Sequence, residues 1–327
     1  MLGRSPLEVS VLGLGCWPLG GGEGWGGTDE AQAIATIHEA LGQGVNFFDT
    51  AESYNDGRSE EIVGKALVDR RDRALIATKI SPTNTEPDTL RRHLEASLVR
   101  LQTGYVDFYQ VHWPIREHSV QAAFEALDEL RREGKVRFIG VSNHGVENLE
   151  EVLETGVPIV SNQLHYSLAS RAIEFEIQPE CHQHGIGIIA YMALLQGVLA
   201  GIYDSPDEVP DFRRRTRHFE DRGQARHGQS GAEDLLFTVL TQIRAVSEQV
   251  GAPMAQLALA WVMAKSDVDC VLVGGRKPEQ LQRNVRAARL ELSDDTVARL
   301  DEITEPLRQR LGANADYWQT KEDSRMA

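Results

Sequence analysis

The chain has 327 residues, of which 41% are hydrophobic and 25% are charged, and 49 acidic against 34 basic residues give a formal net charge of −15. This apolar content excludes a disordered chain, and the acidic charge disfavours nucleic acid as a partner, because phosphate binding needs a basic face. Cys16, Cys181 and Cys270 form no C-x-x-C pair, so neither a disulfide framework nor a zinc knuckle is expected.

No apolar stretch approaches the roughly 20 residues of a membrane span, so no membrane partner is expected. The N-terminus, Met1 to Pro6, lacks the apolar core of a signal peptide, and a cytoplasmic location is expected. His182 and His184 have a spacing that metal pairs can show, but no third ligand accompanies them, and we expect no metal.

Short apolar runs alternate with longer helical patterns along the chain. The runs lie at 9–15, 45–50, 74–80, 105–113, 136–143, 158–166, 185–191 and 268–275. Each run is apolar on both faces and bounded by turn residues, which is typical of parallel strands covered on both sides. The segments between them, such as 89–102, carry leucines at three- and four-residue spacing, which predicts helices. Eight such cycles predict one closed (β/α)₈ barrel spanning 1–327 rather than two domains.

Other segments fall outside the eight cycles. Residues 2–10 are expected to form a hairpin that plugs the bottom of the barrel, and 293–307 an extra helix capped by Ser293, before a polar tail at 308–327. A long irregular loop at 204–232 carries Arg213, Arg214, Arg215, Arg217, Arg222 and Arg226. This arginine cluster has two interpretations, a solvated loop or a lid that neutralises cofactor phosphates, and the sequence leaves both open.

The stretch from Gly22 to Gly27 matches G-x-G-x-x-G, and Asp49 follows about twenty residues later, as in the dinucleotide fingerprint of a Rossmann fold. In that fold the first glycine lies directly where the strand ends, whereas here residues 17–21 intervene. We therefore favour a long loop over one mouth of the barrel and keep a Rossmann dehydrogenase as an alternative.

Polar residues end several of the expected strands. Asp49, Lys79 and His112 end the second, third and fourth, and Tyr54 lies in the loop after Asp49. Barrel enzymes carry their chemistry at these strand ends. A lysine there needs a partner such as Asp49, and its charge lowers the pKa of a nearby tyrosine, which makes the hydroxyl a usable proton donor and acceptor. Each residue alone has an ordinary structural explanation, but their joint placement favours an active site. A neutral imidazole can orient a carbonyl, and carbonyl reduction would then need nicotinamide as hydride source.

Around these residues the sequence resembles the aldo-keto reductase family, over nearly the whole chain. The matching segments, in family order, are VNFFDTAESY (45–54), ATKI (77–80), YVDFYQVHWP (105–114), GVSN (140–143), NQLHYS (162–167), AYMALLQGVLAG (190–201) and GGRKPEQLQRN (274–284). Residues 13–30 resemble the bacterial branch related to voltage-gated potassium channel β subunits. The resemblance implies NADPH-dependent reduction of an aldehyde or ketone, or the reverse oxidation, with NADH still open. The alternative is a slow nucleotide-sensing or interaction subunit.

The resemblance also implies a role for each of the four strand-end residues. Tyr54 would be the acid/base, Lys79 would lower its pKa, Asp49 would anchor Lys79, and His112 would orient the carbonyl. The substrate pocket would be formed by Trp25, Tyr54, His112 and Trp113. A small-molecule carbonyl or alcohol is the partner that this site implies, and the sequence gives no oligomeric state.

For the cofactor, the resemblance implies that Ser142, Asn143 and Gln163 hold the nicotinamide carboxamide while Tyr191 stacks on the ring. The other implied cofactor positions are Gly15, Cys16, Trp17, Asp49, Met192, Ala193, Leu194, Gln196, Gly197, Gly275, Arg276, Gln280 and Asn284. The segment 192–201 would run along the pyrophosphate, and the last three residues would hold the adenosine end. An arginine beside a helix N-terminus suits the 2′-phosphate of NADP.

The sequence departs from the family pattern in three segments. Met192 and Ala193 stand where relatives have Ser-Pro, and Cys16 replaces a threonine and is interpreted as a small buried residue. Gly274 and Gly275 replace Lys-Ser, so an NADP preference would rest on Arg276 and Lys277.

Overall fold

A computed structural model of the chain describes residues 1–22 and 24–327. Its parallel strands close into a barrel in chain order, each strand paired with the next and the last with the first. The strands are β1 (Leu12–Gly15), β2 (Phe47–Asp49), β3 (Leu75–Ile80), β4 (Val106–Val111), β5 (Val136–Ser142), β6 (Ser161–His165), β7 (Gly187–Tyr191) and β8 (Val268–Gly274). All lie within the predicted runs, which confirms the barrel. An open Rossmann sheet is excluded.

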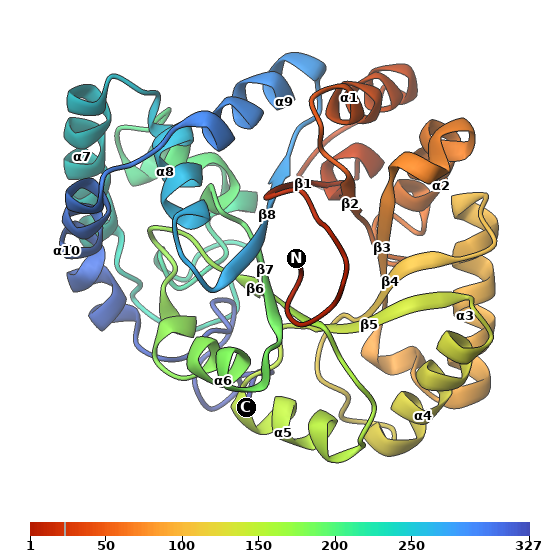
Figure 1. The fold of residues 1–327 in the computed structure, drawn as a ribbon. Helices are drawn as coiled ribbons and strands as arrows, with labels where there is room; N and C mark the ends of the chain where they lie inside the picture. The colour runs from red at the N-terminus through yellow and green to blue at the C-terminus, as the bar shows by residue number, and fades with distance from the viewer. Residues whose placement is uncertain (23) are drawn as a thin grey trace.

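Helices surround the barrel on its outside (Figure 1). They are α1 (Glu30–Gly42), α2 (Arg58–Leu67), α3 (Pro87–Leu101), α4 (Val120–Arg132), α5 (Val146–Glu154), α6 (Ile177–His184), α7 (Glu233–Val250), α8 (Met254–Met263), α9 (Pro278–Val285) and α10 (Asp294–Leu311). Both α7 and α8 lie between β7 and β8, and α7 packs against α10. The extra helix is thus α10. Its predicted cap is confirmed, because the Ser293 hydroxyl accepts the Thr296 N–H at 3.2 Å.

The N-terminal segment closes the bottom of the barrel as a turn, not as the expected hairpin of 2–10. Two backbone hydrogen bonds hold the turn, from the Leu2 N–H to the Leu7 carbonyl at 3.1 Å and from the Ser5 N–H to the Leu2 carbonyl at 3.0 Å. The Gly3 N–H donates to Asp269 Oδ2 on β8, at 2.8 Å, and ties the turn to the barrel. No strand is present within 2–10. The plug itself is present, since the Leu2 side chain is fully buried.

Apolar side chains fill the lower half of the barrel interior. They include Leu2, Phe47, Ala77, Phe108, Ile189 and Cys270. The rings of Phe47 and Phe108 meet edge to face with centroids 5.6 Å apart. Because this end is packed shut, the polar residues of the barrel interior lie toward the carboxyl ends of the strands.

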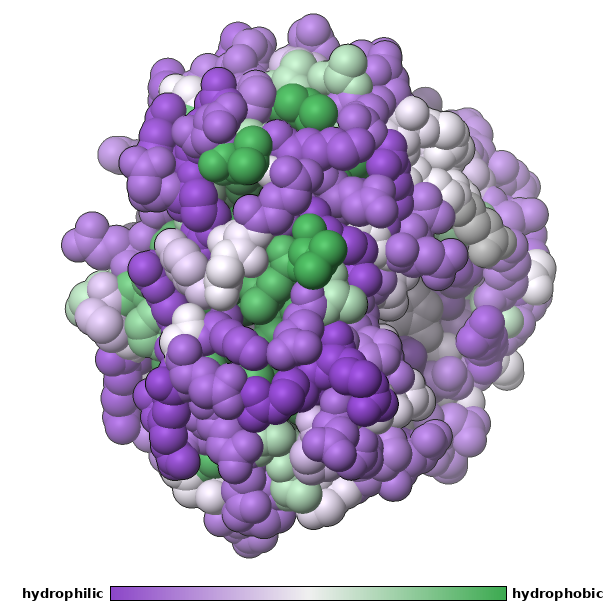
Figure 2. Space-filling view, turned by 90° about the vertical axis from the view of Figure 1, so that its right-hand side faces the viewer, coloured by the Kyte–Doolittle hydropathy of each residue, from purple (hydrophilic) through white to green (hydrophobic). Residues whose placement is uncertain are grey.

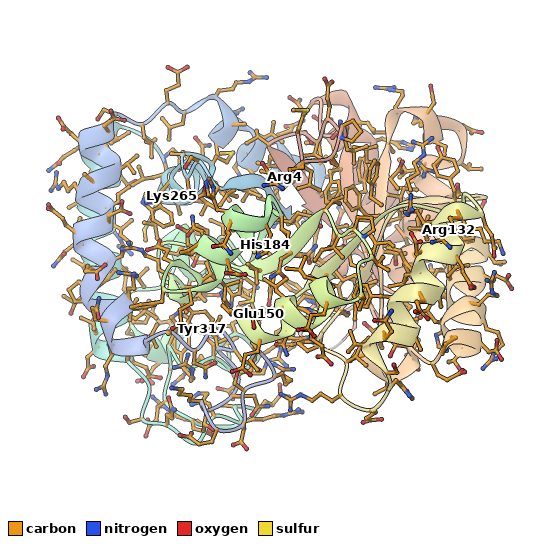
Figure 3. All side chains as sticks on the ribbon, turned by 60° about the horizontal axis from the view of Figure 1, so that its bottom comes forward. Arg4, Arg132, Glu150, His184, Lys265 and Tyr317 are labelled. Carbon is orange, nitrogen blue, oxygen red and sulfur yellow. The ribbon has the colours of Figure 1, made fainter. Side chains whose placement is uncertain are left out.

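The outer surface is largely hydrophilic on the side that carries α2 and α3, where hydrophobic residues occur as small separate spots (Figure 2). Charged side chains such as Arg132 and Glu150 extend outward from the helices (Figure 3). Among the described residues, no helix has both the length and the apolar content that crossing a membrane requires.

Candidate active site

The four strand-end residues predicted from the sequence lie together at the mouth of the barrel. Lys79 Nζ donates to Asp49 Oδ1 at 2.5 Å, to the Thr50 carbonyl at 2.9 Å and to the Tyr54 hydroxyl at 3.2 Å. The ring of Tyr54 meets that of His112 edge to face, with centroids 5.7 Å apart. Three strands therefore deliver an ion pair, a phenol and an imidazole to one place.

Lys79 is fully buried yet remains charged. Burial alone would lower the pKa of Lys79, because the ammonium loses its water. The negative charge of Asp49 and the hydrogen bonds to Asp49 and Tyr54 outweigh burial, so the pKa of Lys79 is raised. The mouth therefore holds a fixed positive charge next to the Tyr54 hydroxyl.

The pKa of Tyr54 shifts in the direction opposite to the one expected from Lys79 alone. Burial of the phenol is the largest cause and raises the pKa of Tyr54, while the charge of Lys79 and its hydrogen bond lower it only in part. Desolvation of a phenolate is costly, and one ammonium does not offset it here. Tyr54 is therefore held protonated, which is the form that a proton donor needs.

His112 is held neutral at the mouth. Burial is the largest cause that lowers the pKa of His112 well below its usual range, and the positive charges of Lys79 and Arg325 lower it further. A neutral imidazole carries one N–H, which can donate to a carbonyl oxygen. This agrees with the neutral imidazole expected from the sequence.

The second oxygen of Asp49 accepts two amide hydrogen bonds that the sequence did not predict. Gln163 Nε2 lies 2.8 Å and Gln110 Nε2 3.2 Å from Asp49 Oδ2. Gln110 was missed, although strand alternation was a usable signal, because it precedes His112 by two residues on β4. Among the described residues, the buried Oε1 of Gln110 has no hydrogen-bond partner.

The residues expected to hold a carboxamide interlock beside His112. Asn143 Nδ2 donates to the His112 carbonyl at 3.1 Å, and Asn143 Oδ1 accepts the Tyr191 hydroxyl at 2.7 Å. Ser142 Oγ donates to the Gln163 carbonyl at 3.0 Å. Asn143 has a φ of 60°, a left-handed conformation that asparagine tolerates better than most residues. The four residues thus form one group at the ends of β5, β6 and β7.

The loop after β7 has an unusual backbone. Met192, Leu195 and Gln196 have φ values of 54°, 44° and 52°, and Gly197 follows at 97°. Left-handed conformations cost energy for residues other than glycine and tend to cluster where a ligand is held. Ala193, within this loop, is buried. The loop that contains the departure from Ser-Pro is therefore sharply bent.

The start of α9 joins the glycine-rich loop. Arg276 Nη2 donates to the Gly27 carbonyl at 2.7 Å, and the Arg276 N–H donates to Gln280 Oε1 at 2.9 Å. Asn284 Nδ2 donates to the Gly274 carbonyl at 3.1 Å, which places all three predicted adenosine residues together.

The G-x-G-x-x-G stretch, Gly22 to Gly27, is part of the loop between β1 and α1, as we expected. Its second residue, Glu23, lies outside the described residues. At the end of β1, Cys16 is fully buried, and burial is the largest cause that raises the pKa of its thiol. A thiol held protonated in this way is a poor nucleophile, which agrees with its interpretation as a small buried residue.

Aromatic rings wall the mouth on two sides. Trp17 lies 6.0 Å from the Tyr54 ring and 5.5 Å from Trp25, between ring centroids. Phe212, from the 204–232 loop, lies 6.2 Å from Trp17 and was not predicted. The β1 loop and the 204–232 loop therefore meet over the tyrosine.

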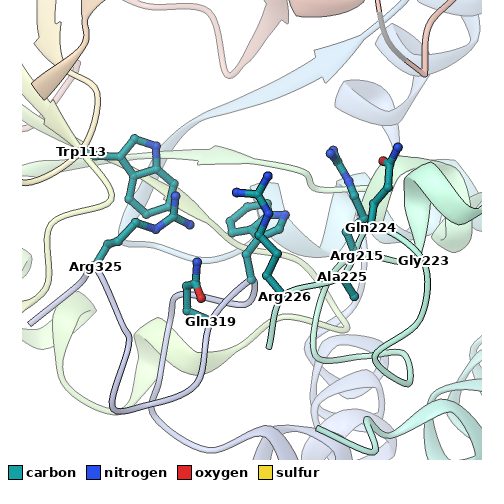
Figure 4. Close-up of a pocket in the computed structure, with 9 residues that line it drawn as sticks. Trp113, Arg215, Gly223, Gln224, Ala225, Arg226, Gln319 and Arg325 are labelled. Carbon is teal, nitrogen blue, oxygen red and sulfur yellow. The ribbon is translucent and has the colours of Figure 1, made fainter. Parts of the chain in front are cut away.

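On the other side Trp113 meets Trp318 of the C-terminal tail, with ring centroids 6.1 Å apart. These two rings line a cavity of ≈ 490 Å³, together with Arg226, Gln319 and Arg325 (Figure 4). Trp318 belongs to the tail at 308–327, so the path of the tail brings its ring to this cavity. The volume falls in the range that small-molecule sites usually have.

Most arginines of the 204–232 loop anchor the loop itself. Arg214 and Arg222 pair with Glu233 at 3.2 and 2.7 Å, and Arg217 donates to the Leu311 carbonyl at 2.9 Å. Arg214 and Arg217 are buried, so for these two the interpretation as a solvated loop is wrong. Among the described residues, Arg226 has no ion pair or hydrogen bond.

Comparisons with known proteins show the family of the chain. The profile of the Aldo/keto reductase family matches residues 11–305. An NADH-specific methylglyoxal reductase of Escherichia coli is 33% identical, over 94% of this chain and 98% of its own length. The aldo-keto reductase YhdN of Bacillus subtilis is 35% identical, over 84% of each chain.

Solved structures give the same result. A glycerol dehydrogenase of Gluconobacter oxydans superimposes with a TM-score of 0.81 at 28% identity, over 94% of each chain. An aldo-keto reductase of Klebsiella pneumoniae in complex with NADPH superimposes with a TM-score of 0.73 at 29% identity, over 90% of this chain and 91% of that chain.

Proposed function

Since the chain belongs to the aldo/keto reductase family, we propose that it is a nicotinamide-dependent oxidoreductase that reduces an aldehyde or ketone to an alcohol, with Tyr54 as proton donor. The observation that carries this proposal is the contact of Lys79 Nζ with both Asp49 and the Tyr54 hydroxyl. It combines a protonated phenol with a fixed positive charge, next to a neutral imidazole.

The chain's own residues account for binding and proton transfer. The His112 N–H donates to the substrate carbonyl oxygen and fixes its direction toward Tyr54. The Tyr54 hydroxyl gives its proton to that oxygen as negative charge develops on it. Lys79 then stabilises the phenolate, and Asp49 holds Lys79 charged and in place. In the reverse direction the phenolate accepts the proton of an alcohol.

The residues at the mouth fit a nicotinamide dinucleotide. Asn143 and Gln163 bear amides next to His112 and Asp49 and would hold the carboxamide, and Tyr191, which donates to Asn143, would stack on the ring. Arg276, at the start of α9, would hold the adenosine end. When bound, the cofactor supplies the hydride that no side chain can supply.

NADPH is the cofactor that Arg276 favours, because its guanidinium can pair with a 2′-phosphate. NADH stays open as a substitute. One relative is named NADH-specific, whereas a structural neighbour is described in complex with NADPH. The same donors at the mouth serve either nucleotide.

Steady-state consumption of NADPH and of NADH with a panel of aldehydes tests the proposal. We expect turnover with at least one nucleotide, and no turnover with either would overturn the proposed activity. A slow nucleotide-sensing subunit is less well supported, because the four proposed catalytic residues are in contact with one another. Lys79 contacts Asp49 and Tyr54, and Tyr54 contacts His112.

A further inference from the structure

The cavity beside the proposed catalytic residues is basic as well as aromatic. Arg226 from the 204–232 loop and Arg325 from the tail both line it, and Figure 4 shows both guanidinium groups in the space beside Trp113. None of the described residues that line this cavity is acidic. In a chain of net charge −15, such a lining is a local reversal of sign.

Arg215, Arg226 and Arg325 all line the cavity, and Arg226 and Arg325 differ in their surroundings. Arg325 is held by two hydrogen bonds to Asp316, at 2.7 and 2.8 Å, and its guanidinium carbon lies 3.6 Å from the centre of the Trp113 ring. Arg226 forms no ion pair and no hydrogen bond with any residue that the structure describes. It is also exposed to solvent. Arg325 therefore shapes the cavity wall, while Arg226 keeps its donors available for a ligand.

Two of the residues that line the cavity, Trp113 and Arg325, are close to His112. Trp113 lines the cavity and directly follows His112 in the chain. Arg325 also lines the cavity, and its positive charge contributes to lowering the pKa of His112. A molecule whose carbonyl reaches His112 would therefore extend past Trp113 toward Arg226.

We propose that the preferred substrates are aldehydes or ketones that carry an anionic group away from the carbonyl, and that Arg226 binds this group. The proposal rests on the proposed function, because it names the substrate class of the same site. A guanidinium binds carboxylate and phosphate oxygens alike through paired N–H groups. Both groups are therefore tested, each against a neutral compound of similar length.

The substrate pairs are succinic semialdehyde with butanal, and glyceraldehyde 3-phosphate with glyceraldehyde. We expect the wild type to have a kcat/KM about tenfold or more higher for the anionic member of at least one pair, a size typical of a charge-assisted hydrogen bond. The pair that shows the preference identifies the group as carboxylate or phosphate. Equal kcat/KM values within both pairs would overturn the inference.

The variant Arg226→Gln should lose this preference, mainly through a higher KM for the anionic aldehyde, and should leave the neutral aldehyde unchanged. Arg226→Lys should retain part of the preference, because a charge remains. The matched control is Arg132→Gln, which removes one charge at the C-terminal end of α4 (Figure 3) and does not line the cavity. An equal loss on neutral and anionic aldehydes in Arg226→Gln would contradict the inference.

Fluorescence titration with NADPH or NADH tests whether Arg226 binds the cofactor instead of the substrate. We expect Arg226→Gln to bind the nucleotide as the wild type does, and weaker binding would assign Arg226 to the cofactor phosphates instead. If the wild type reduces butanal but shows no anionic preference, only the inference fails. If it reduces none of the four aldehydes with either nucleotide, the proposed function itself fails.

Discussion

Lys79 and Tyr54 are in hydrogen-bond contact, with Nζ 3.2 Å from the phenol oxygen, and the same ammonium is paired with Asp49. The ammonium of Lys79 is therefore shared between the carboxylate of Asp49 and the hydroxyl that we propose as the proton donor.

Removing the Tyr54 hydroxyl should abolish turnover without affecting cofactor binding. In Tyr54→Phe no acid remains within reach of the carbonyl, and a general acid contributes about 10²–10⁴-fold to rate. We expect kcat to fall by that factor while the nucleotide Kd from fluorescence titration stays unchanged. Near wild-type kcat in this variant would rule out Tyr54 as the proton donor.

The Asp49–Lys79 pair should show the energetics of a buried ion pair. Both side chains are buried, so Asp49→Asn leaves an ammonium without its partner and should lower the free energy of unfolding by about 3–5 kcal/mol. The double variant Asp49→Asn, Lys79→Met leaves no charge unpaired and should be at least as stable as Asp49→Asn. Denaturant unfolding measures both, and a less stable double variant would argue against the pair.

The pH dependence of reduction should follow the shifted groups. The pKa of Tyr54 is raised, so the proton donor stays loaded beyond the usual tyrosine value of about 10. The pKa of His112 is lowered well below its usual range, so the imidazole stays neutral below the usual value of about 6.5. We expect kcat/KM for reduction to be flat between these limits. A loss of kcat/KM as the pH rises through an apparent pKa near 7 would contradict the raised pKa of Tyr54.

Buried histidines should make the protein less stable in mild acid. Burial is the main cause that lowers the pKa of His144 to about 4 and of His218 to about 3. In the unfolded chain both histidines take up a proton near pH 6.5, whereas in the folded chain they stay neutral, so stability falls as the pH drops below 6.5.

The loss should reach on the order of 3 kcal/mol for each histidine by pH 4. Urea unfolding at several pH values measures this slope. His218→Gln should flatten it, whereas His182→Gln, in which the replaced side chain is 75% exposed, is the control. An equal slope in His218→Gln and wild type would exclude His218 as a source of the acid lability.

Arg276 should discriminate between the two nucleotides. If its guanidinium pairs with the 2′-phosphate, Arg276→Ala should raise the Kd for NADPH about tenfold or more and change that for NADH little. Arg283→Ala removes an exposed arginine from the last turn of the same helix and serves as the control. Equal losses for both nucleotides would assign Arg276 to holding Gly27, to which it donates in this structure.

Much of the site could be predicted because its residues lie at the carboxyl ends of strands. In parallel strands that close into a barrel, all carboxyl ends meet at one mouth. The eight predicted strand–helix cycles therefore already imply that Asp49, Lys79 and His112 converge there. Gln110 was within reach of the same logic, since every second residue of a strand faces the same side.

Contacts between loops were beyond the sequence. Phe212 over Trp17, Trp318 against Trp113, and Arg226 in the cavity join segments far apart in the chain. Loop paths have no periodicity from which to infer a partner. At 2–10, where we expected a hairpin, the chain forms a turn that is tied to the distant β8 by the Gly3 N–H.

The sequence by itself determined the barrel and the identity of the four residues at its mouth, because hydrophobic periodicity and residue order encode both. Only the tertiary structure decided the net direction of the pKa of Tyr54 and the positive sign of the cavity beside it. Both depend on how completely distant loops cover the mouth and which charges they bring there, since desolvation and Coulomb interactions are properties of three-dimensional surroundings.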